Sequence, residues 1–212
     1  MGHCVSEIGV AVLGASGATG RHVVHAALRR GHEVTALVRR PGSFTPAERL
    51  SEVIWTDLFD RATVASALTG MGAVVSTLGG AVKGPTTVCT DGIRSAVAGM
   101  DQVGVSRLVA VSAHGVAETH DRSLYSLAVW AGAAERMRDK ETMESLITAS
   151  DLDWTIVRPP ALNNTPATSR YRVATDLPIH LWTSIGRADL ADFLVREAEQ
   201  PQYVGAFPRI TR

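Results

Sequence analysis

A glycine-rich segment near the start of the chain has the composition of a phosphate-binding turn: Gly14, Ala15, Ser16, Gly17, Ala18, Thr19 and Gly20. It follows the apolar run 8–13 and precedes a helical pattern at 19–30. The free N–H groups and the helix dipole at such a helix start favour an anion. Gly14 allows the tight turn, Gly17 lets a pyrophosphate approach the backbone, and Gly20 lets the helix pack on the strand. The segment predicts a dinucleotide site, the alternative being a glycine-rich turn without a ligand.

The end of the second apolar run, 33–38, indicates which dinucleotide is bound. An NAD-preferring site usually carries an acidic residue there for the ribose 2′-hydroxyl, but Glu33 lies at the opposite end of this run. Arg39 and Arg40 follow the run instead, and a guanidinium suits the 2′-phosphate of NADP(H). Arg39 is the better placed of the two, with Ser16 as a further contact. We predict NADP(H) as the cofactor, the alternative being a pair of solvated arginines.

Two further turns are candidate cofactor contacts. Asp57 and Leu58 follow a third strand pattern, and Asp57 either accepts from the adenine amino group or caps the helix that begins near residue 61. Leu78 and Gly79 follow a fourth strand, where small residues let a dinucleotide lie across the sheet edge. A plain turn is the alternative for this second pair.

Predicted strands and helices alternate along the chain. Strands are predicted at 8–13, 33–38, 53–55, 73–77, 107–112 and 154–157, and helices at 19–30, 61–68, 87–103, 131–149 and 187–199. The strand runs are almost continuously apolar, which is typical of parallel strands covered on both faces. The fold class is therefore α/β, a Rossmann-type doubly wound parallel sheet. We predict a single NAD(P)-binding domain over 1–212, with 160–186 as a loop-rich substrate-cap region.

Composition excludes several classes of partner. Lys plus Arg and Asp plus Glu both number 21, so the balanced charge offers no basic field for nucleic acid or anionic membrane. Two cysteines are too few for a disulfide framework and suggest a reducing compartment. His22 and His25 have no neighbouring ligand that completes a metal site. We expect a cytoplasmic protein, a monomer or weak homodimer, that acts on a small molecule, with no metal, nucleic acid or membrane partner.

Several segments together resemble the atypical short-chain dehydrogenase/reductases, a group with NmrA-like and flavin-reductase or biliverdin-reductase-B-like members. The matching segments are 14–20, 37–39, 109–113, 152–159 and 185–191. The resemblance implies NADP(H) in an extended pose, with the nicotinamide near the end of the strand at 107–112. It also implies that Arg187 and Asp189 open a helix that fixes the substrate region, the alternative being that Asp189 only caps this helix.

The resemblance also implies candidate catalytic residues. The wider superfamily uses Ser, Tyr and Lys, with the last two spaced Y-x-x-x-K. Ser112 matches the Ser and would orient a substrate carbonyl, while Lys140 matches the Lys and would hold the nicotinamide ribose. Arg136 stands where Tyr is expected, and a guanidinium cannot donate a proton as a phenol does. The alternatives are a plain strand-end Ser and a solvated Lys.

Two residues are candidates for the missing proton donor. Tyr125 follows Ser112 at a distance that resembles the Ser-to-Tyr spacing, although Val129 stands where the Lys would be. His114 lies two residues after Ser112 and is expected to titrate near neutrality, the alternative being a surface-loop histidine. Flavin-reductase-like relatives often have His after the double proline, where this chain has Ala161.

These residues favour an NADP(H)-dependent oxidoreductase, a reductase that transfers a hydride to a small planar or carbonyl acceptor such as a flavin, a quinone or a ketone. One alternative is an NmrA-like redox sensor that binds NADP(H) without turnover, which the missing Tyr favours. Another is a cofactor-retaining epimerase or dehydratase. The fold decides neither the acceptor nor the oligomeric state.

Overall fold

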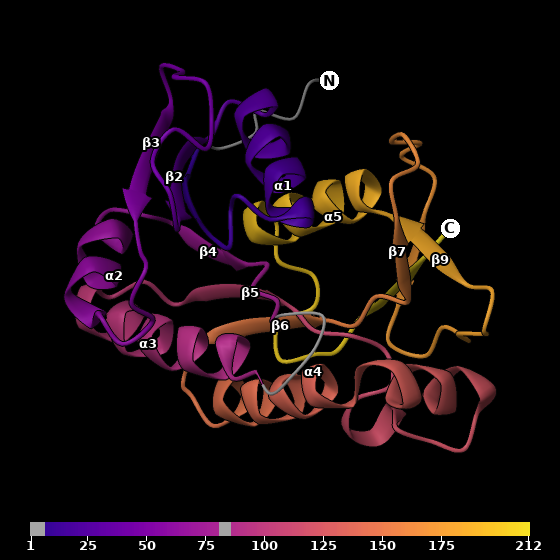
Figure 1. The fold of residues 1–212 in the computed structure, drawn as a ribbon. Coiled ribbons are helices and arrows are strands. Elements are labelled where there is room, and N and C mark those ends of the chain that lie inside the picture. The colour runs from indigo at the N-terminus through magenta and orange to yellow at the C-terminus, as the bar shows by residue number, and fades with distance from the viewer. Residues whose placement is uncertain (1–6, 81–85) are drawn as a thin grey trace.

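The computed structural model describes residues 7–80 and 86–212, in which a parallel sheet is covered by helices on both faces (Figure 1). The strands of this sheet are β1 (Gly9–Leu13), β2 (Glu33–Val38), β3 (Leu50–Ile54), β4 (Ala73–Ser76), β5 (Arg107–Val111) and β6 (Asp153–Val157). They lie in the order β3-β2-β1-β4-β5-β6, all parallel. This order defines a Rossmann-type doubly wound α/β fold, so the predicted fold class is confirmed.

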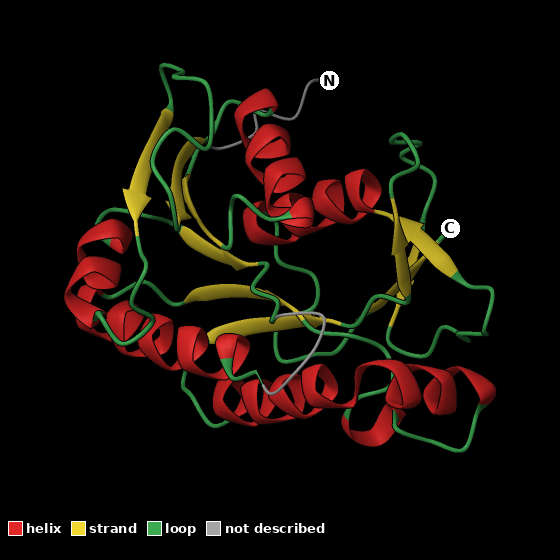
Figure 2. Ribbon diagram, in the orientation of Figure 1, coloured by secondary structure: helices red, strands yellow, loops and turns green. Residues whose placement is uncertain are grey.

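The helices that cover the sheet are α1 (Ala18–Arg29), α2 (Arg61–Leu68), α3 (Val88–Val103), α4 (Leu124–Thr148) and α5 (Arg187–Glu199). α1 and α5 pack together on one face, and α2, α3 and α4 cover the other (Figure 2). β1 shows why both faces are apolar. Val10 and Val12 are buried toward α1 and α5, whereas Ala11 and Leu13 are buried toward α2, α3 and α4.

The structure corrects one helix boundary. The sequence pattern predicts a helix at 131–149, but α4 begins at Leu124, where Ser123 Oγ accepts from the Ser126 N–H at 3.2 Å. The backbone of Ala133 is non-helical, with φ −148° and ψ 28°, so the helix bends there. Leu124 is 73% exposed, so the first part of α4 lacks the buried apolar stripe that sequence periodicity detects.

The C-terminal region adds short strands beside the sheet. β7 (Ala161–Asn163) pairs with β9 (Ser184–Gly186), and β8 (Arg172–Ala174) pairs with β10 (Arg209–Thr211). These pairs lie beyond the carboxyl edge of the sheet, opposite the start of α4 (Figure 1). The assignment of 160–186 as a substrate cap stays a prediction.

The start of α5 holds this region in place. The Asp189 carboxylate accepts from the Thr168 and Ser169 N–H groups at 2.8 and 2.9 Å, and Arg187 donates to Asn164 Oδ1 at 2.7 Å. Gly186 occupies the N-cap of α5 without a side-chain bond, so a capping role for Asp189 is wrong. Asp189 and Arg187 instead fasten the loop before β8 to α5. In the described part of the chain, every helix is too short or too polar to cross a membrane.

Candidate active site

The glycine-rich segment lies where the strand order reverses, between β1 and β4. Gly14 has φ +72°, a conformation that favours glycine, and an added Cβ would lie 3.1 Å from the Thr77 carbonyl oxygen. Thr77 fixes the turn, because its N–H and its hydroxyl both donate to the Leu13 carbonyl, at 2.9 and 3.0 Å. Ligands of doubly wound sheets bind at this reversal point, outside the carboxyl ends of the strands.

The start of α1 is open to an anion. Gly17 is the N-cap residue, no side chain caps the helix, and the first turn carries no acidic residue. Gly20 brings the helix against the turn, since a Cβ there would lie 2.3 Å from the Gly14 oxygen and 2.7 Å from the Ala15 oxygen. The Gly17 N–H donates within the turn, to the Gly14 carbonyl at 3.0 Å. The first turn of α1, which begins at the exposed Ala18, therefore offers its N–H groups and the positive end of the helix dipole.

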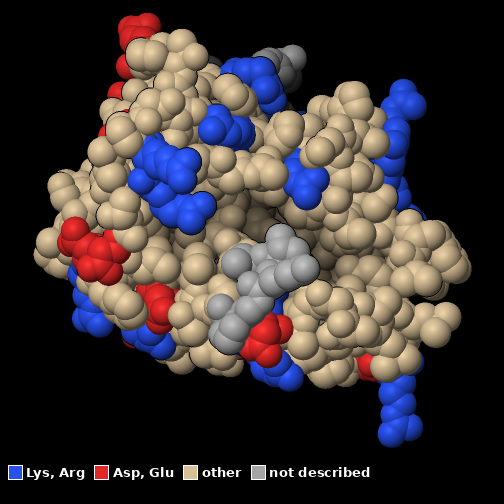
Figure 3. Space-filling model, viewed as in Figure 1, with Lys and Arg blue, Asp and Glu red and all other residues tan. Residues whose placement is uncertain are grey.

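Basic side chains flank this turn. Arg39 and Arg40 are exposed at the end of β2, and neither forms an ion pair with a described carboxylate. Arg21, which sequence analysis missed, donates to the carbonyls of Ser16 at 3.1 Å and Ser43 at 2.7 Å. It links the glycine turn to the loop after β2, and its place directly after Gly20 was the available signal. Figure 3 shows basic side chains on the rim of a central hollow.

The loop after β2 is held from β3. The Glu52 carboxylate accepts from the N–H groups of Gly42 at 2.9 Å, Ser43 at 3.3 Å and Phe44 at 2.6 Å. This contact fixes the backbone that follows Arg39 and Arg40.

Two roles are predicted for Asp57, a contact with adenine and a cap for the following helix, and the structure tests one of them. Asp57 is exposed after β3, and its Oδ1 accepts from the Phe59 N–H at 2.9 Å. The α2 cap is Asp60, whose Oδ1 accepts from the Thr63 N–H at 3.0 Å. A capping role for Asp57 is therefore wrong, and its contact with adenine stays a prediction.

Leu58 and Leu78 anchor this edge to α3. The Ser95 hydroxyl donates to the Leu58 carbonyl at 2.5 Å, and the Cys89 thiol donates to the Leu78 carbonyl at 3.4 Å. The Leu78 side chain is so close to Gly92 that a Cβ there would lie 2.4 Å from it. Gly79 is exposed beside this anchor, so its backbone is accessible to a ligand.

Lys140 reaches the sheet edge from α4. Its Nζ donates to the Val111 carbonyl, the last of β5, at 2.9 Å. Asp139 sets this position, because its buried carboxylate accepts from the Cys89 and Thr90 N–H groups, both at 2.9 Å, at the start of α3. The structure thus brings Lys140 to the end of β5, next to Ser112.

Asp139→Ala should destabilise the protein by about 3 kcal/mol, because two buried N–H groups lose their acceptor and a helix start loses its negative charge. Urea unfolding would measure this change. Glu135→Ala is the matched control on the exposed face of α4, with an expected change below about 0.5 kcal/mol. Equal unfolding midpoints for the two variants would contradict the capping role.

Ser112, His114 and Tyr125 lie together beyond β5. The Ser112 hydroxyl and His114 Nδ1 are buried and have no hydrogen-bond partner among the described residues. The rings of His114 and Tyr125 lie 5.2 Å apart between centroids. Burial lowers the pKa of His114 to about 4 and raises the pKa of Tyr125 to about 12. The expectation that His114 titrates near neutrality is therefore wrong, because desolvation disfavours its charged form.

His114 should make stability fall in acid. Its folded-state pKa of about 4 lies below the unfolded value of 6.5, so its contribution is complete above pH 6.5 and is lost as pH falls toward 4. The free energy of unfolding, measured between those pH values, should fall less in His114→Gln than in the natural protein. Parallel curves for the two proteins would contradict the buried neutral imidazole.

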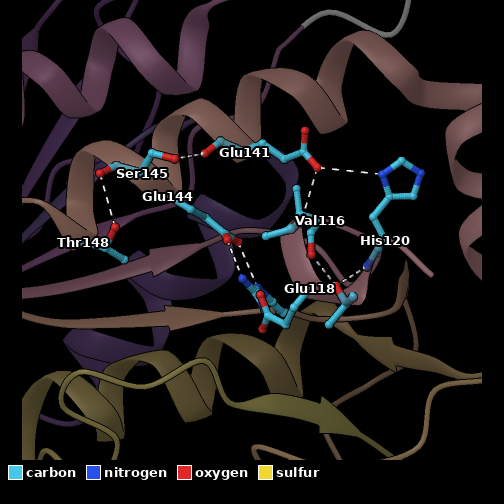
Figure 4. Close-up of polar contacts among 11 residues, drawn as sticks. Val116, Glu118, His120, Glu141, Glu144, Ser145 and Thr148 are labelled. Carbon is cyan, nitrogen blue, oxygen red and sulfur yellow. Dashed lines mark hydrogen bonds and ion pairs between the residues drawn. The ribbon is translucent and has the colours of Figure 1, made fainter.

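The loop between β5 and α4 is fastened to α4 and β6. The Arg158 guanidinium pairs with Glu144 through bonds of 3.0 and 2.5 Å and also pairs with Glu118 (Figure 4). Glu141 points toward His120, whose ring is stacked 4.0 Å from Trp130. These contacts hold the segment that follows Ser112 and so shape the wall of the site. No cluster of three metal-binding side chains occurs within 7–80 and 86–212.

Comparison with known proteins identifies the family. A protein-family model described as NAD(P)H-binding matches residues 14–201. The chain belongs to the NAD(P)H-binding family. An isoflavone reductase homologue from maize is 37% identical over 79 residues, which are 33% of this chain and 26% of that relative. This match thus spans about a quarter of the relative's length.

Solved structures share the fold of this NAD(P)H-binding protein. ChuY, an anaerobillin reductase from Escherichia coli, has a TM-score of 0.80 and 24% identity, covering 95% of this chain and 96% of that one. A short-chain dehydrogenase/reductase from Veillonella parvula in complex with NADP has a TM-score of 0.81 and 14% identity, covering 98% and 95%. These likenesses show the fold that this chain shares with the two structures.

Proposed function

We propose that this protein is an NADP(H)-dependent reductase that transfers a hydride to a small planar or carbonyl acceptor. The observation that carries the proposal is the position of Lys140, with its Nζ 2.9 Å from the Val111 carbonyl oxygen, beside the unpartnered hydroxyl of Ser112. The glycine turn at 14–20 opens onto the same sheet edge, so one ligand can extend from the turn to the end of β5.

The proposed cofactor contacts follow the sheet edge. The start of α1 would hold the diphosphate, Arg39 with Arg40 and Ser16 the 2′-phosphate, and Asp57 the adenine amino group. Leu58, Leu78 and Gly79 would line the path of the cofactor between its adenine end and its nicotinamide end. The NADP complex of the structurally similar Veillonella protein supports this choice of cofactor.

The remaining side chains act on the acceptor. NADPH supplies the hydride from its nicotinamide ring when it is bound. Lys140 holds the nicotinamide ribose, and Ser112 donates a hydrogen bond to the acceptor oxygen or ring nitrogen. At pH 7 His114 is neutral and Tyr125 keeps its proton, so Tyr125 or solvent would supply the proton that balances the hydride.

Arg39→Ala should raise the Kd for NADPH about tenfold and leave the Kd for NADH unchanged, because one charge-assisted contact to the 2′-phosphate is lost. Fluorescence titration with both nucleotides measures the two constants. Arg29→Ala, an exposed arginine on α1 away from the glycine turn, serves as the control and should bind both nucleotides as the natural protein does. An unchanged NADPH affinity in Arg39→Ala would reject this residue as the selector.

The reaction is tested by following NADPH absorbance without oxygen, with FMN, menadione or a ketone added. Acceptor-dependent oxidation is the expected result. Tight binding with no oxidation by any acceptor would favour an NmrA-like sensor, which Arg136 in place of Tyr supports, or a cofactor-retaining epimerase or dehydratase.

We further propose a cytosolic location and a monomeric or weakly dimeric state. Cys89 is a free thiol, and two cysteines are too few for a disulfide framework, which supports a reducing compartment. Light scattering of the purified protein tests the oligomeric state, and a stable tetramer would contradict it.

A further inference from the structure

Arg136 lies on α4, and the proposed reaction gives it no role. It precedes Lys140 by four residues on α4, so the two side chains lie on one face of the helix. α4 begins after the carboxyl end of β5 and ends just before the start of β6. Arg136 therefore lies one helical turn, about 5.4 Å, farther beyond the sheet edge than Lys140. Ligands of doubly wound sheets bind in that region.

The charge of Arg136 is not balanced by its neighbours on α4. Glu135 pairs with Arg138, and the Asp139 carboxylate accepts from two N–H groups of α3. Glu141 accepts from the Ala117 N–H at 3.2 Å and faces His120 at 4.0 Å. Each carboxylate near Arg136 in sequence thus has another partner.

The Arg136 side chain is half-buried, and its Nε is fully buried with no hydrogen-bond partner in the described ranges. Neither Arg136 nor Lys140 forms an ion pair with a carboxylate in that part of the chain. A guanidinium whose Nε is buried without an acceptor is costly, and an anion that accepts from it removes this cost. Arg136 is thus a cation without a described counter-charge, one helical turn from Lys140 on α4.

We propose that Arg136 selects the acceptor by binding a carboxylate that the acceptor carries beside its hydride-receiving group. This inference rests on the proposed reductase function and narrows its substrate class to carboxylate-bearing carbonyl or planar compounds. A planar guanidinium matches a carboxylate through two parallel hydrogen bonds. The cofactor diphosphate is assigned to the start of α1 and the ribose to Lys140, so the group that meets Arg136 belongs to the acceptor.

Binding of benzoate and benzamide tests the proposal without turnover. The two probes have similar shapes, but only benzoate carries a carboxylate. Calorimetry on the NADP⁺-saturated protein should give a Kd for benzoate about tenfold lower than that for benzamide, the difference expected of a charge-assisted pair. Arg136→Gln should remove this preference, and Arg136→Lys should retain part of it. Arg138→Gln, two residues away on the exposed face, should keep it in full.

Two results would overturn the inference while the reductase proposal stands. One is NADP⁺ binding with no preference for benzoate in the natural protein or an unchanged preference in Arg136→Gln. The other is a loss of NADP⁺ affinity in Arg136→Gln with the benzoate preference intact, which would assign the guanidinium to the cofactor. If the natural protein binds neither NADP⁺ nor NADPH, the proposed function fails, and the same probes on the free protein still decide the role of Arg136.

Discussion

Gly20→Ala is expected to lower NADPH affinity at least about a hundredfold and to destabilise the fold by about 3 kcal/mol. The added Cβ would lie 2.3 Å from the Gly14 oxygen, 2.7 Å from the Ala15 oxygen and 2.8 Å from the Ala15 Cα. These are backbone atoms of the phosphate-binding turn, so relief of the clash must move α1 away from β1. The N–H groups at the helix start would then no longer converge on a phosphate. NADPH titration and urea unfolding measure the two effects.

Gly132→Ala is the matched control for this change. A Cβ at Gly132 meets no atom within 4 Å, and the residue lies on α4, away from the glycine turn. Its NADPH affinity should equal that of the natural protein, and its stability should be equal or higher by up to about 1 kcal/mol. If Gly20→Ala bound NADPH as tightly as Gly132→Ala does, the turn would not be the diphosphate site.

Lys140→Met should reduce kcat about a hundredfold, with a much smaller effect on NADPH affinity. The ammonium donates to the Val111 carbonyl at 2.9 Å and keeps further N–H donors for the ribose and the acceptor. Met keeps much of the length and apolar stem but removes the charge and the donors. The substitution should therefore disturb the orientation of the reacting groups and leave the diphosphate contacts in place. Steady-state kinetics with the acceptor found in the oxidation assay measures kcat and KM separately.

Arg138→Gln is the control for Lys140→Met, because Arg138 is exposed and pairs with Glu135 on the outer face of α4. Thermal unfolding of both variants shows whether α4 remains packed. If Lys140→Met were well folded and had the kcat of the natural protein, the proposed role of Lys140 in the reaction would be wrong.

Sequence alone predicted the parallel sheet and the place of the glycine turn well. Both depend on local signals, namely continuous apolar runs and glycines directly after the first strand. The contacts of Arg21 with Ser43 and of Asp139 with Cys89 were not predicted. They join residues distant in sequence, so they depend on how the elements pack.

The wrong predictions have physical causes that residue types alone do not show. A helix cap was one of two roles predicted for Asp57 and for Asp189, but Asp60 caps α2 and Asp189 bonds to a loop instead. Cap geometry depends on backbone angles that residue type does not fix. His114 was expected to titrate near neutrality, and burial, which the sequence does not show, lowers its pKa to about 4. The bend at Ala133 likewise interrupts the period that marks a helix.

Equilibrium titration of the purified protein with NADPH and NADH, followed by nicotinamide fluorescence, tests the central claim most directly. The account predicts saturable binding of NADPH at one site, with a Kd at least about tenfold lower than that for NADH. Gly20→Ala should show no such binding under the same conditions. Failure of the natural protein to bind either nucleotide would contradict the assigned cofactor site and the reductase proposal that depends on it.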